Sequence, residues 1–263
     1  FSDLGIGPAI VQALERQGII EPFEVQKETI PDSLLGRDVC CRAPTGSGKT
    51  LAFGLPLIAR SRRAESKRPT SLILTPTREL AEQINSVLKP IAAAVDRDIV
   101  SIYGGVSYKN QYNALNRGVD ILVACPGRLL DLLDRRALKL DDVETVVLDE
   151  ADRMADMGFL PQVEWILRKV ERKHQTLLFS ATLDGAVNSL IQRYQTDPTM
   201  HEVEAEEITV EEMTHRFIHV HQRDKVKVAA AISRPVSRTL MFSNTKAGCD
   251  RLVKKLLDEG IRA

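Results

Sequence analysis

The sequence lacks a net charge, a cysteine pattern and any long apolar run. Its 36 basic residues balance its 36 acidic residues, so the chain is no general polycation and any surface for nucleic acid must be local. The four cysteines show no spacing typical of a disulfide framework or a zinc site, which indicates reduced thiols. No apolar run approaches the roughly 18 residues of a membrane span, and neither a signal-peptide pattern nor a fixed-period repeat occurs. We expect a soluble, monomeric, intracellular protein with no membrane partner, cytoplasmic or, in a eukaryote, nuclear.

What the sequence does have is short apolar runs that alternate with longer helical patterns. Strands are expected at residues 38–42, 71–75, 99–102, 121–124, 145–148 and 175–179. Helices are expected at residues 49–62, 78–95, 110–116, 127–135, 159–170 and 186–194. The strands are apolar along their length, as in Leu72-Ile73-Leu74, which is typical of a parallel sheet covered by helices on both faces. This pattern predicts an α/β doubly wound fold that binds ligands at the carboxyl ends of its strands.

The pattern changes after Asp197-Pro198, where glutamates become frequent. We interpret residues 204–213 as an acidic, solvated linker between a first domain, residues 1–203, and the start of a second, residues 214–263. The second part predicts strands at 215–221 and 239–242 and helices at 224–232 and 246–258, too few for a complete α/β domain. A basic stretch from Arg60 to Arg68 is interpreted as a solvated loop in preference to a nucleic-acid contact.

A phosphate-binding loop is predicted between the first strand and the helix that follows it. Its residues are Ala43, Pro44, Thr45, Gly46, Ser47, Gly48, Lys49 and Thr50. The glycines let several backbone N–H groups point at one anion, and the helix N-terminus adds partial positive charge. Lys49 can reach β- and γ-phosphate oxygens, and Thr50 offers a hydroxyl to Mg²⁺. The first position is Ala43, where the strict pattern has glycine.

Two acidic residues, Asp149 and Glu150, end the apolar run Val146-Val147-Leu148. Buried carboxylates are costly without partners, and a magnesium–phosphate group beside the loop is such a partner. In this interpretation Asp149 holds the metal and Glu150 orients or deprotonates the attacking water. A helix N-cap is the structural alternative for the pair.

With these residues in place, the chain resembles the DEAD-box ATP-dependent RNA helicases. Asp149-Glu150-Ala151-Asp152 spells the box that names the family, and the segment from Gly18 to Gln26 resembles its Q motif. The remaining first-domain motifs have counterparts in Pro76-Thr77-Arg78-Glu79-Leu80, Gly104-Gly105, Pro126-Gly127-Arg128 and Ser180-Ala181-Thr182. The resemblance covers residues 1–200 and implies a RecA-like P-loop domain followed by an incomplete second RecA-like domain. Phe23 and Glu24 stand where the family usually has Thr-Pro, and Cys125 stands where it usually has threonine.

The Q-motif resemblance concerns the nucleotide base. A glutamine side chain can accept from the N6 amine of adenine and donate to N7, so Gln26 predicts ATP over GTP. By resemblance, Phe1 stacks on the base. The structural alternative for Gln26 is an ordinary polar residue at a helix start.

Three further pairs are implied to contact one RNA strand: Thr77 with Arg78, Gly104 with Gly105, and Gly127 with Arg128. Helix N-termini with an arginine can bind backbone phosphates without reading sequence, and adjacent glycines permit close approach of a ligand. The implied contacts are to phosphate and sugar, so little sequence specificity is expected. Two helix caps and a turn are the structural alternatives.

The resemblance also implies a last group of residues that couple the ATP state of the protein to RNA strand separation. Ser180 and Thr182 carry hydroxyls that can bridge the acidic box, including Asp152, to neighbouring loops. Capping of the helix at 186–194 is the structural alternative.

The expected function is that of an RNA-stimulated ATPase that uses ATP and Mg²⁺, binds single-stranded RNA, locally separates duplexes and has protein partners in RNA metabolism. Residues 240–244 resemble the first motif of the second domain, and the later motifs with their phosphate-binding arginines are absent. Such an arginine contributes about 10³–10⁵ in rate, so this chain alone is expected to bind ATP but to hydrolyse it poorly. The alternatives are a DNA translocase of the same superfamily and an ATP-dependent RNA clamp or scaffold.

Overall fold

The computed structural model describes residues 1–170, 173–183, 185–204, 214 and 216–262. The chain divides into two compact units, Phe1–Ile208 and Thr209–Ala263, so that the boundary falls in the segment interpreted as a linker. Most of that segment, residues 205–213, lies outside the described residues. Within the described ranges, no helix is both long and apolar enough to cross a membrane.

The first unit is built on a seven-stranded sheet in which every pair of neighbouring strands is parallel. The strands are β1 (Val39–Arg42), β2 (Ser71–Leu74), β3 (Ile99–Ile102), β4 (Ile121–Ala124), β5 (Thr145–Asp149), β6 (Gln175–Ser180) and β7 (Thr199–Glu202). Their order across the sheet is β3-β4-β2-β5-β6-β1-β7. The six predicted strands are confirmed to within one residue at each end. The seventh was not predicted because an edge strand buries only part of its surface, and β7 has no apolar run.

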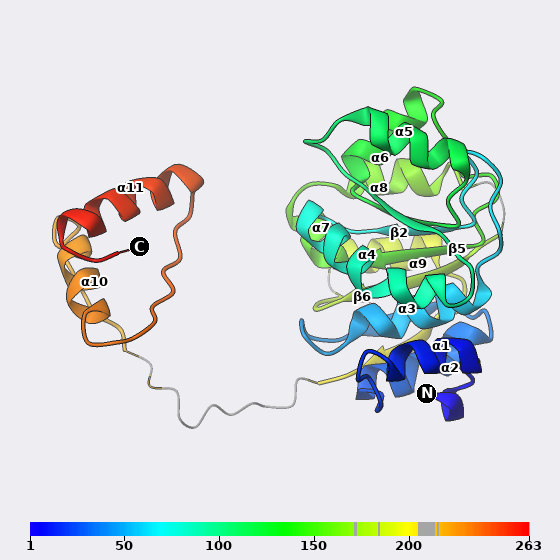
Figure 1. Cartoon of the computed structure of the whole chain (residues 1–263), viewed down its shortest axis with the longest axis horizontal. Helices are drawn as coiled ribbons and strands as arrows, with labels where there is room; N and C mark the ends of the chain where they lie inside the picture. The colour runs from blue at the N-terminus through cyan, green and yellow to red at the C-terminus, as the bar shows by residue number, and fades with distance from the viewer. Residues whose placement is uncertain (171–172, 184, 205–213, 215, 263) are drawn as a thin grey trace. The chain divides into compact units, whose positions relative to one another are not determined.

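Helices cover both faces of this sheet, as predicted (Figure 1). They are α1 (Pro8–Glu15), α2 (Glu24–Leu34), α3 (Lys49–Arg60), α4 (Arg78–Ala93), α5 (Tyr108–Arg117), α6 (Pro126–Asp134), α7 (Ala151–Asp156), α8 (Leu160–Leu167) and α9 (Gly185–Tyr194), with a short 3₁₀ turn, η1 (Ser2–Leu4). The sequence did not predict α1, α2 or α7. Helix α7 has only six residues, which is too short for a helical periodicity to be recognised.

Alternate residues of strands β1 to β6 face two separate cores. Along β1, Cys41 belongs to the core under α1–α4, and Cys40 belongs to the core under α5–α9. In the first core, the rings of Phe53 and Phe179 meet edge to face at 5.4 Å. Gly54 is needed here, because a β-carbon on it would lie 2.3 Å from a methyl group of Leu88. The glycine therefore lets α3 and α4 pack closely.

The basic stretch after α3 forms ion pairs inside the first unit. Three of its arginines contact carboxylates: Arg62 with Glu144, Arg63 with Asp96, Asp98 and Asp120, and Arg68 with Asp141 and Asp142. A fourth, Arg60, donates to the carbonyl oxygen of Leu34 at 3.0 Å. Nearby carboxylates thus balance the positive charge of these arginines, which is consistent with a solvated loop.

The second unit contains α10 (Lys225–Ser233) and α11 (Lys246–Asp258), which pack together and confirm the two predicted helices. The predicted strands at 215–221 and 239–242 were wrong for the described residues, since 216–221 and 239–242 form no strand. Strand backbone needs a neighbouring strand to pair with, and the described part of this unit offers none. Phe217 and Phe242, which a sheet would bury on one face, are 99% and 90% exposed.

Candidate functional site

The strand order sorts the predicted site residues along the carboxyl edge of the sheet. The loops after β1, β5 and β6 carry the phosphate loop, the acidic box and Ser180, and these strands lie in the order β5-β6-β1. The loops after β2, β3 and β4 carry the three pairs implied to contact RNA, and these strands form the other half of the sheet. Strands β2 and β5 are neighbours, so the acidic box lies where the two halves meet.

The phosphate loop is shaped by two glycines and closed by hydrogen bonds to its own backbone. Gly46 and Gly48 have φ values of 84° and 91°, in the left-handed region that favours glycine. The Ser47 hydroxyl donates to the Pro44 carbonyl oxygen at 2.8 Å. Lys49 is 8% exposed, and its ammonium donates to the Ala43 carbonyl oxygen at 2.8 Å. A buried ammonium with one neutral partner is well placed to bind an anion.

The side chain of Gln26 packs against this loop and is shielded from solvent. Its Nε2 donates to the Gly48 carbonyl oxygen at 3.0 Å, and its Oε1 accepts from the Phe23 backbone N–H at 3.0 Å. The side chain is 2% exposed, and it retains one N–H and one lone pair for a further partner. Phe1, by contrast, packs against the first core at the start of η1.

Asp149 ends β5 with a carboxylate that is buried and incompletely bonded. It is 5% exposed, and its Oδ1 has no hydrogen-bond partner. Burial raises the pKa of this carboxyl from 3.8 to about 7; nearby Lys49 opposes the rise, and Glu150 adds to it. Lys49 at the start of α3 and Asp149 at the end of β5 are thus brought near each other.

Glu150 turns the chain sharply out of the strand. Its φ of 51° is left-handed, a conformation that costs a non-glycine residue about 1–2 kcal/mol. It begins α7, and its carboxylate pairs with Arg153 at 3.2 Å. Strained backbone of this kind concentrates at functional sites.

The donor set at this edge fits a magnesium ion held jointly with phosphate. Mg²⁺ prefers oxygen ligands and is bound through one or two protein groups together with substrate phosphates and water. Asp149 supplies a buried oxygen without a partner, and the Thr50 hydroxyl stands at the start of α3 on the loop. The described residues contain no cluster of three or more metal-binding side chains, so an all-protein metal site is not formed there.

Ser180 connects the phosphate loop to the acidic box. Its carbonyl oxygen accepts from the Ala43 N–H at 3.0 Å, and its hydroxyl accepts from the Asp152 N–H at 3.1 Å. The Asp152 carboxylate in turn accepts from the Thr182 N–H at 3.2 Å. The Thr182 contact therefore uses backbone, whereas the Ser180 contact uses the predicted hydroxyl.

On the other half of the edge, the structure assigns a capping role to Thr77. Its hydroxyl accepts from the Leu80 N–H at 3.3 Å and begins α4. Arg78 is exposed, with its guanidinium 5.0 Å from the centre of the Tyr103 ring. The cation of this pair is accessible to a backbone phosphate.

Arg128 supports the glycine loop that follows β3. Its guanidinium donates to the Val106 carbonyl oxygen at 3.2 Å and to Gln111 at 3.0 Å, and it lies 4.2 Å from the centre of the Tyr108 ring. Gly104, Gly105 and Gly127 are exposed, and a β-carbon on any of them would meet no atom.

Tyr103, Tyr108 and Gln111 were not recognised from the sequence. Gln111 is 5% exposed and also donates to the Tyr103 carbonyl oxygen at 3.0 Å. Two tyrosines flanking the double glycine were the available signal, since arginines often stack on aromatic rings.

A cavity of about 660 Å³ borders the phosphate loop. It is lined by residues of three segments: Phe23, Glu24, Val25 and Glu28 around the start of α2, residues 44–47 of the loop, and Glu202, Val203 and Glu204 at the end of β7. Its volume suits a small ligand.

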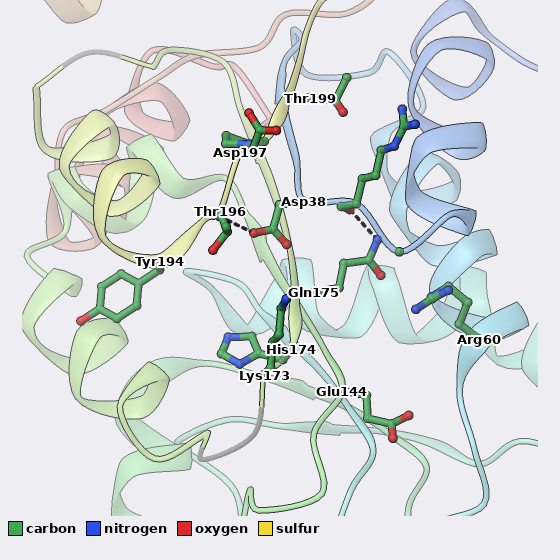
Figure 2. A pocket seen from close by; sticks show the side chains of 13 residues that line it. Asp38, Arg60, Glu144, Lys173, His174, Gln175, Tyr194, Thr196, Asp197 and Thr199 are labelled. Atoms are coloured by element: carbon green, nitrogen blue, oxygen red, sulfur yellow. Dashed lines mark hydrogen bonds between the residues drawn. The ribbon is translucent and has the colours of Figure 1, made fainter.

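A larger cavity, of about 1080 Å³, lies at the amino ends of the strands (Figure 2). Two of its polar side chains, Asp38 and Gln175, are already bonded within the protein. Asp38 accepts from the N–H groups of Thr176 and Thr196, and Gln175 donates to the carbonyl oxygens of Ser33 and Arg37. Parallel α/β sheets bind ligands at the opposite edge, so the smaller cavity is the candidate site.

Comparison with known proteins identifies a family that matches most of the first unit. The family described as DEAD/DEAH box helicase matches residues 23–190. The chain is 38% identical over 266 residues to the DEAD-box ATP-dependent RNA helicase CshA of Streptococcus pneumoniae, covering 100% of this chain and 50% of that protein. It is 38% identical over 258 residues to the ATP-dependent RNA helicase CshA of Listeria monocytogenes, covering 97% and 49%.

A solved structure is similar over nearly the whole chain. The DEAD box protein from the hyperthermophile Methanococcus jannaschii matches with a TM-score of 0.73 and 30% identity, covering 99% of this chain and 70% of that one. The chain spans about half the length of the curated relatives that it matches.

Proposed function

Because the chain belongs to the DEAD/DEAH box helicase family, we propose that it is the ATP-binding part of an ATP-dependent RNA helicase. The observation that carries this proposal is that Lys49 on the phosphate loop and Asp149 at the end of β5 are buried near each other, and that Asp149 Oδ1 has no hydrogen-bond partner. A cation with one neutral partner and a carboxylate oxygen with none are costly to bury in isolation. An ATP phosphate and its metal would provide the missing partners.

ATP binding would use the loop backbone first. The N–H groups at the start of α3 would donate to the phosphate oxygens, and the helix dipole favours negative charge there. The Lys49 ammonium would exchange its bond with Ala43 for the β- and γ-phosphate oxygens. Gln26, held at the loop by Gly48, would use its remaining N–H and lone pair on the edge of adenine.

Hydrolysis would use the two acids at the end of β5. Magnesium, held by Thr50 and Asp149, would neutralise charge on the β- and γ-phosphates. Glu150, raised out of the strand by its left-handed backbone, would orient the attacking water and accept its proton. Its ion pair with Arg153 would hold the carboxylate in one direction.

RNA would bind along the loops after β2, β3 and β4. Arg78 would contribute an accessible charge, and the bare backbone at Gly104, Gly105 and Gly127 would allow a sugar–phosphate chain to approach closely. Arg128 would hold the shape of the glycine loop. Ser180, Asp152 and Thr182 would transmit changes at the phosphate loop toward this half of the edge.

The test measures ATP binding by this chain and steady-state ATP hydrolysis by the full-length natural protein, without nucleic acid, with single-stranded RNA and with single-stranded DNA. We expect stimulation by RNA alone and weaker binding of GTP than of ATP. Lys49→Ala should abolish measurable ATP binding, whereas Glu150→Gln should bind ATP but hydrolyse it at least about a hundredfold more slowly. Lys27→Ala, on the exposed side of α2, is the matched control.

Two outcomes would contradict the proposal. Equal stimulation by DNA would indicate a DNA translocase. Binding of ATP with no stimulation by either nucleic acid would indicate an ATP-dependent scaffold or switch.

A further inference from the structure

We propose that Phe23 is a specificity-determining residue that contacts the base of the bound nucleotide. This inference rests on the proposed function and concerns the same site. Phe23 occupies the N-cap of α2, a position that favours small polar side chains able to accept a backbone hydrogen bond. A phenyl ring cannot do so, and Phe23 makes no side-chain capping bond. Helix capping therefore does not account for the ring.

Core packing does not account for it either. Phe23 is 59% exposed. The other large exposed apolar side chains in the described part of the first unit are aliphatic or methionine: Ile20, Leu35, Met157 and Met200. An exposed aromatic ring that serves neither cap nor core is more informative than a scattered exposed leucine.

The ring lies beside the phosphate loop. Phe23 lines the cavity of about 660 Å³ together with Thr45, Gly46 and Ser47. A β-carbon added to Gly48 would lie 2.6 Å from the ring atom Cδ2 and 2.6 Å from Gln26 Nε2. The ring and the Gln26 amide therefore flank the same point of the loop.

This juxtaposition fits a purine base. Gln26 retains the N–H and the lone pair that an adenine edge requires. A base bonded to that amide would lie within reach of the Phe23 ring. Contact between the flat base and an aromatic ring is favourable both face to face and edge to face. The triphosphate, bound by the loop N–H groups and Lys49, would not need the ring.

The test compares ATP with a ligand that has phosphates but no base. The dissociation constants of ATP and of inorganic tripolyphosphate would be measured by calorimetry for the chain and for Phe23→Thr, Phe23→Tyr and Leu35→Thr. Leu35 is 69% exposed and lies at the opposite end of α2, so it is the matched control. Threonine can cap α2, so the thermal stability of Phe23→Thr should equal or exceed that of the unsubstituted chain.

We expect Phe23→Thr to weaken ATP binding about five- to tenfold and to leave tripolyphosphate binding unchanged. Phe23→Tyr and Leu35→Thr should bind both ligands as the unsubstituted chain does. Unchanged ATP binding by Phe23→Thr would overturn the inference, as would equal weakening of both ligands, which would mean that the ring supports the loop. If the unsubstituted chain binds neither ligand, the proposed function itself fails.

Discussion

The hydroxyl of Ser180 accepts a hydrogen bond from the backbone N–H of Asp152 at 3.1 Å. The same residue accepts through its carbonyl oxygen from Ala43 at the start of the phosphate loop. The side chain is fully buried, so the bond is shielded from water. One residue on β6 therefore fixes the acidic box relative to the loop.

Ser180→Ala should separate these two connections. The backbone bond to Ala43 remains, so ATP affinity should change little. Asp152 loses the partner of its N–H, which should lower the free energy of unfolding by about 1 kcal/mol and reduce RNA stimulation of hydrolysis more than basal hydrolysis. Denaturant unfolding of this chain measures the first effect, and ATPase assays of the full-length natural protein measure the second. Ser189→Ala, exposed on α9, is the control, and an equal loss of basal and stimulated rates would contradict the coupling role.

Asp149 should make the stability of the nucleotide-free, metal-free chain fall as pH rises. Its pKa is about 7 in the folded chain, against an ordinary 3.8. Between these two pH values the folded state therefore binds more protons than the unfolded state. The contribution of Asp149 to the stability of the folded state is greatest below pH 4 and is lost as the pH rises through 7. Asp149→Asn should remove that slope and stabilise the chain at pH 8 by roughly 2 to 4 kcal/mol.

Thermal unfolding between pH 4 and pH 8 measures this difference. Asp156→Asn, exposed at the end of α7, is the matched control. Parallel pH profiles for the chain and for Asp149→Asn would show that this carboxyl is ionised throughout the range.

Arg78 and Arg128 should differ in the salt dependence of RNA binding. Arg78 is accessible, so Arg78→Ala should lower the slope of log affinity against log salt by about 0.7, the value for one contact to a single strand. Arg128→Lys keeps the charge but loses the bonds to Val106 and Gln111, so affinity should fall with the slope unchanged. Fluorescence anisotropy with a labelled RNA, measured from about 50 to 200 mM salt, gives the slope for each variant and so distinguishes the two roles. A reduced slope for Arg128→Lys would indicate a direct phosphate contact.

The four cysteines should react unequally with iodoacetamide. Burial raises the pKa of Cys40 to about 11, of Cys41 to about 12 and of Cys125 to about 11. A raised pKa leaves little reactive thiolate at pH 8, whereas Cys249 is exposed. Mass spectrometry should find Cys249 modified first in the folded chain and all four cysteines modified after denaturation. Early modification of Cys40 or Cys41 would contradict the packed sheet.

Most of the fold could be predicted from the sequence because its signals are local. Six strands are continuous apolar runs, and parallel strands buried on both faces have that composition. The edge strand β7 was not predicted because its residues are only partly buried. The strands expected in the second unit were wrong for the described residues 216–221 and 239–242, because strands depend on partners distant in the sequence. Helix α2 carries Gln26, yet its low amphipathicity and internal Pro31 concealed it.

The sequence by itself determined the chemistry of the loop and the box, since each is a contiguous run of residues whose types define what it can bind. Only the tertiary structure decided how these runs meet. The order β5-β6-β1 brings Asp149 near Lys49, Gln26 bonds to Gly48 across 22 positions of sequence, and Phe23 lies at that same glycine. Strand order and helix packing arise from burial of surfaces far apart in the chain, so no local pattern specifies them.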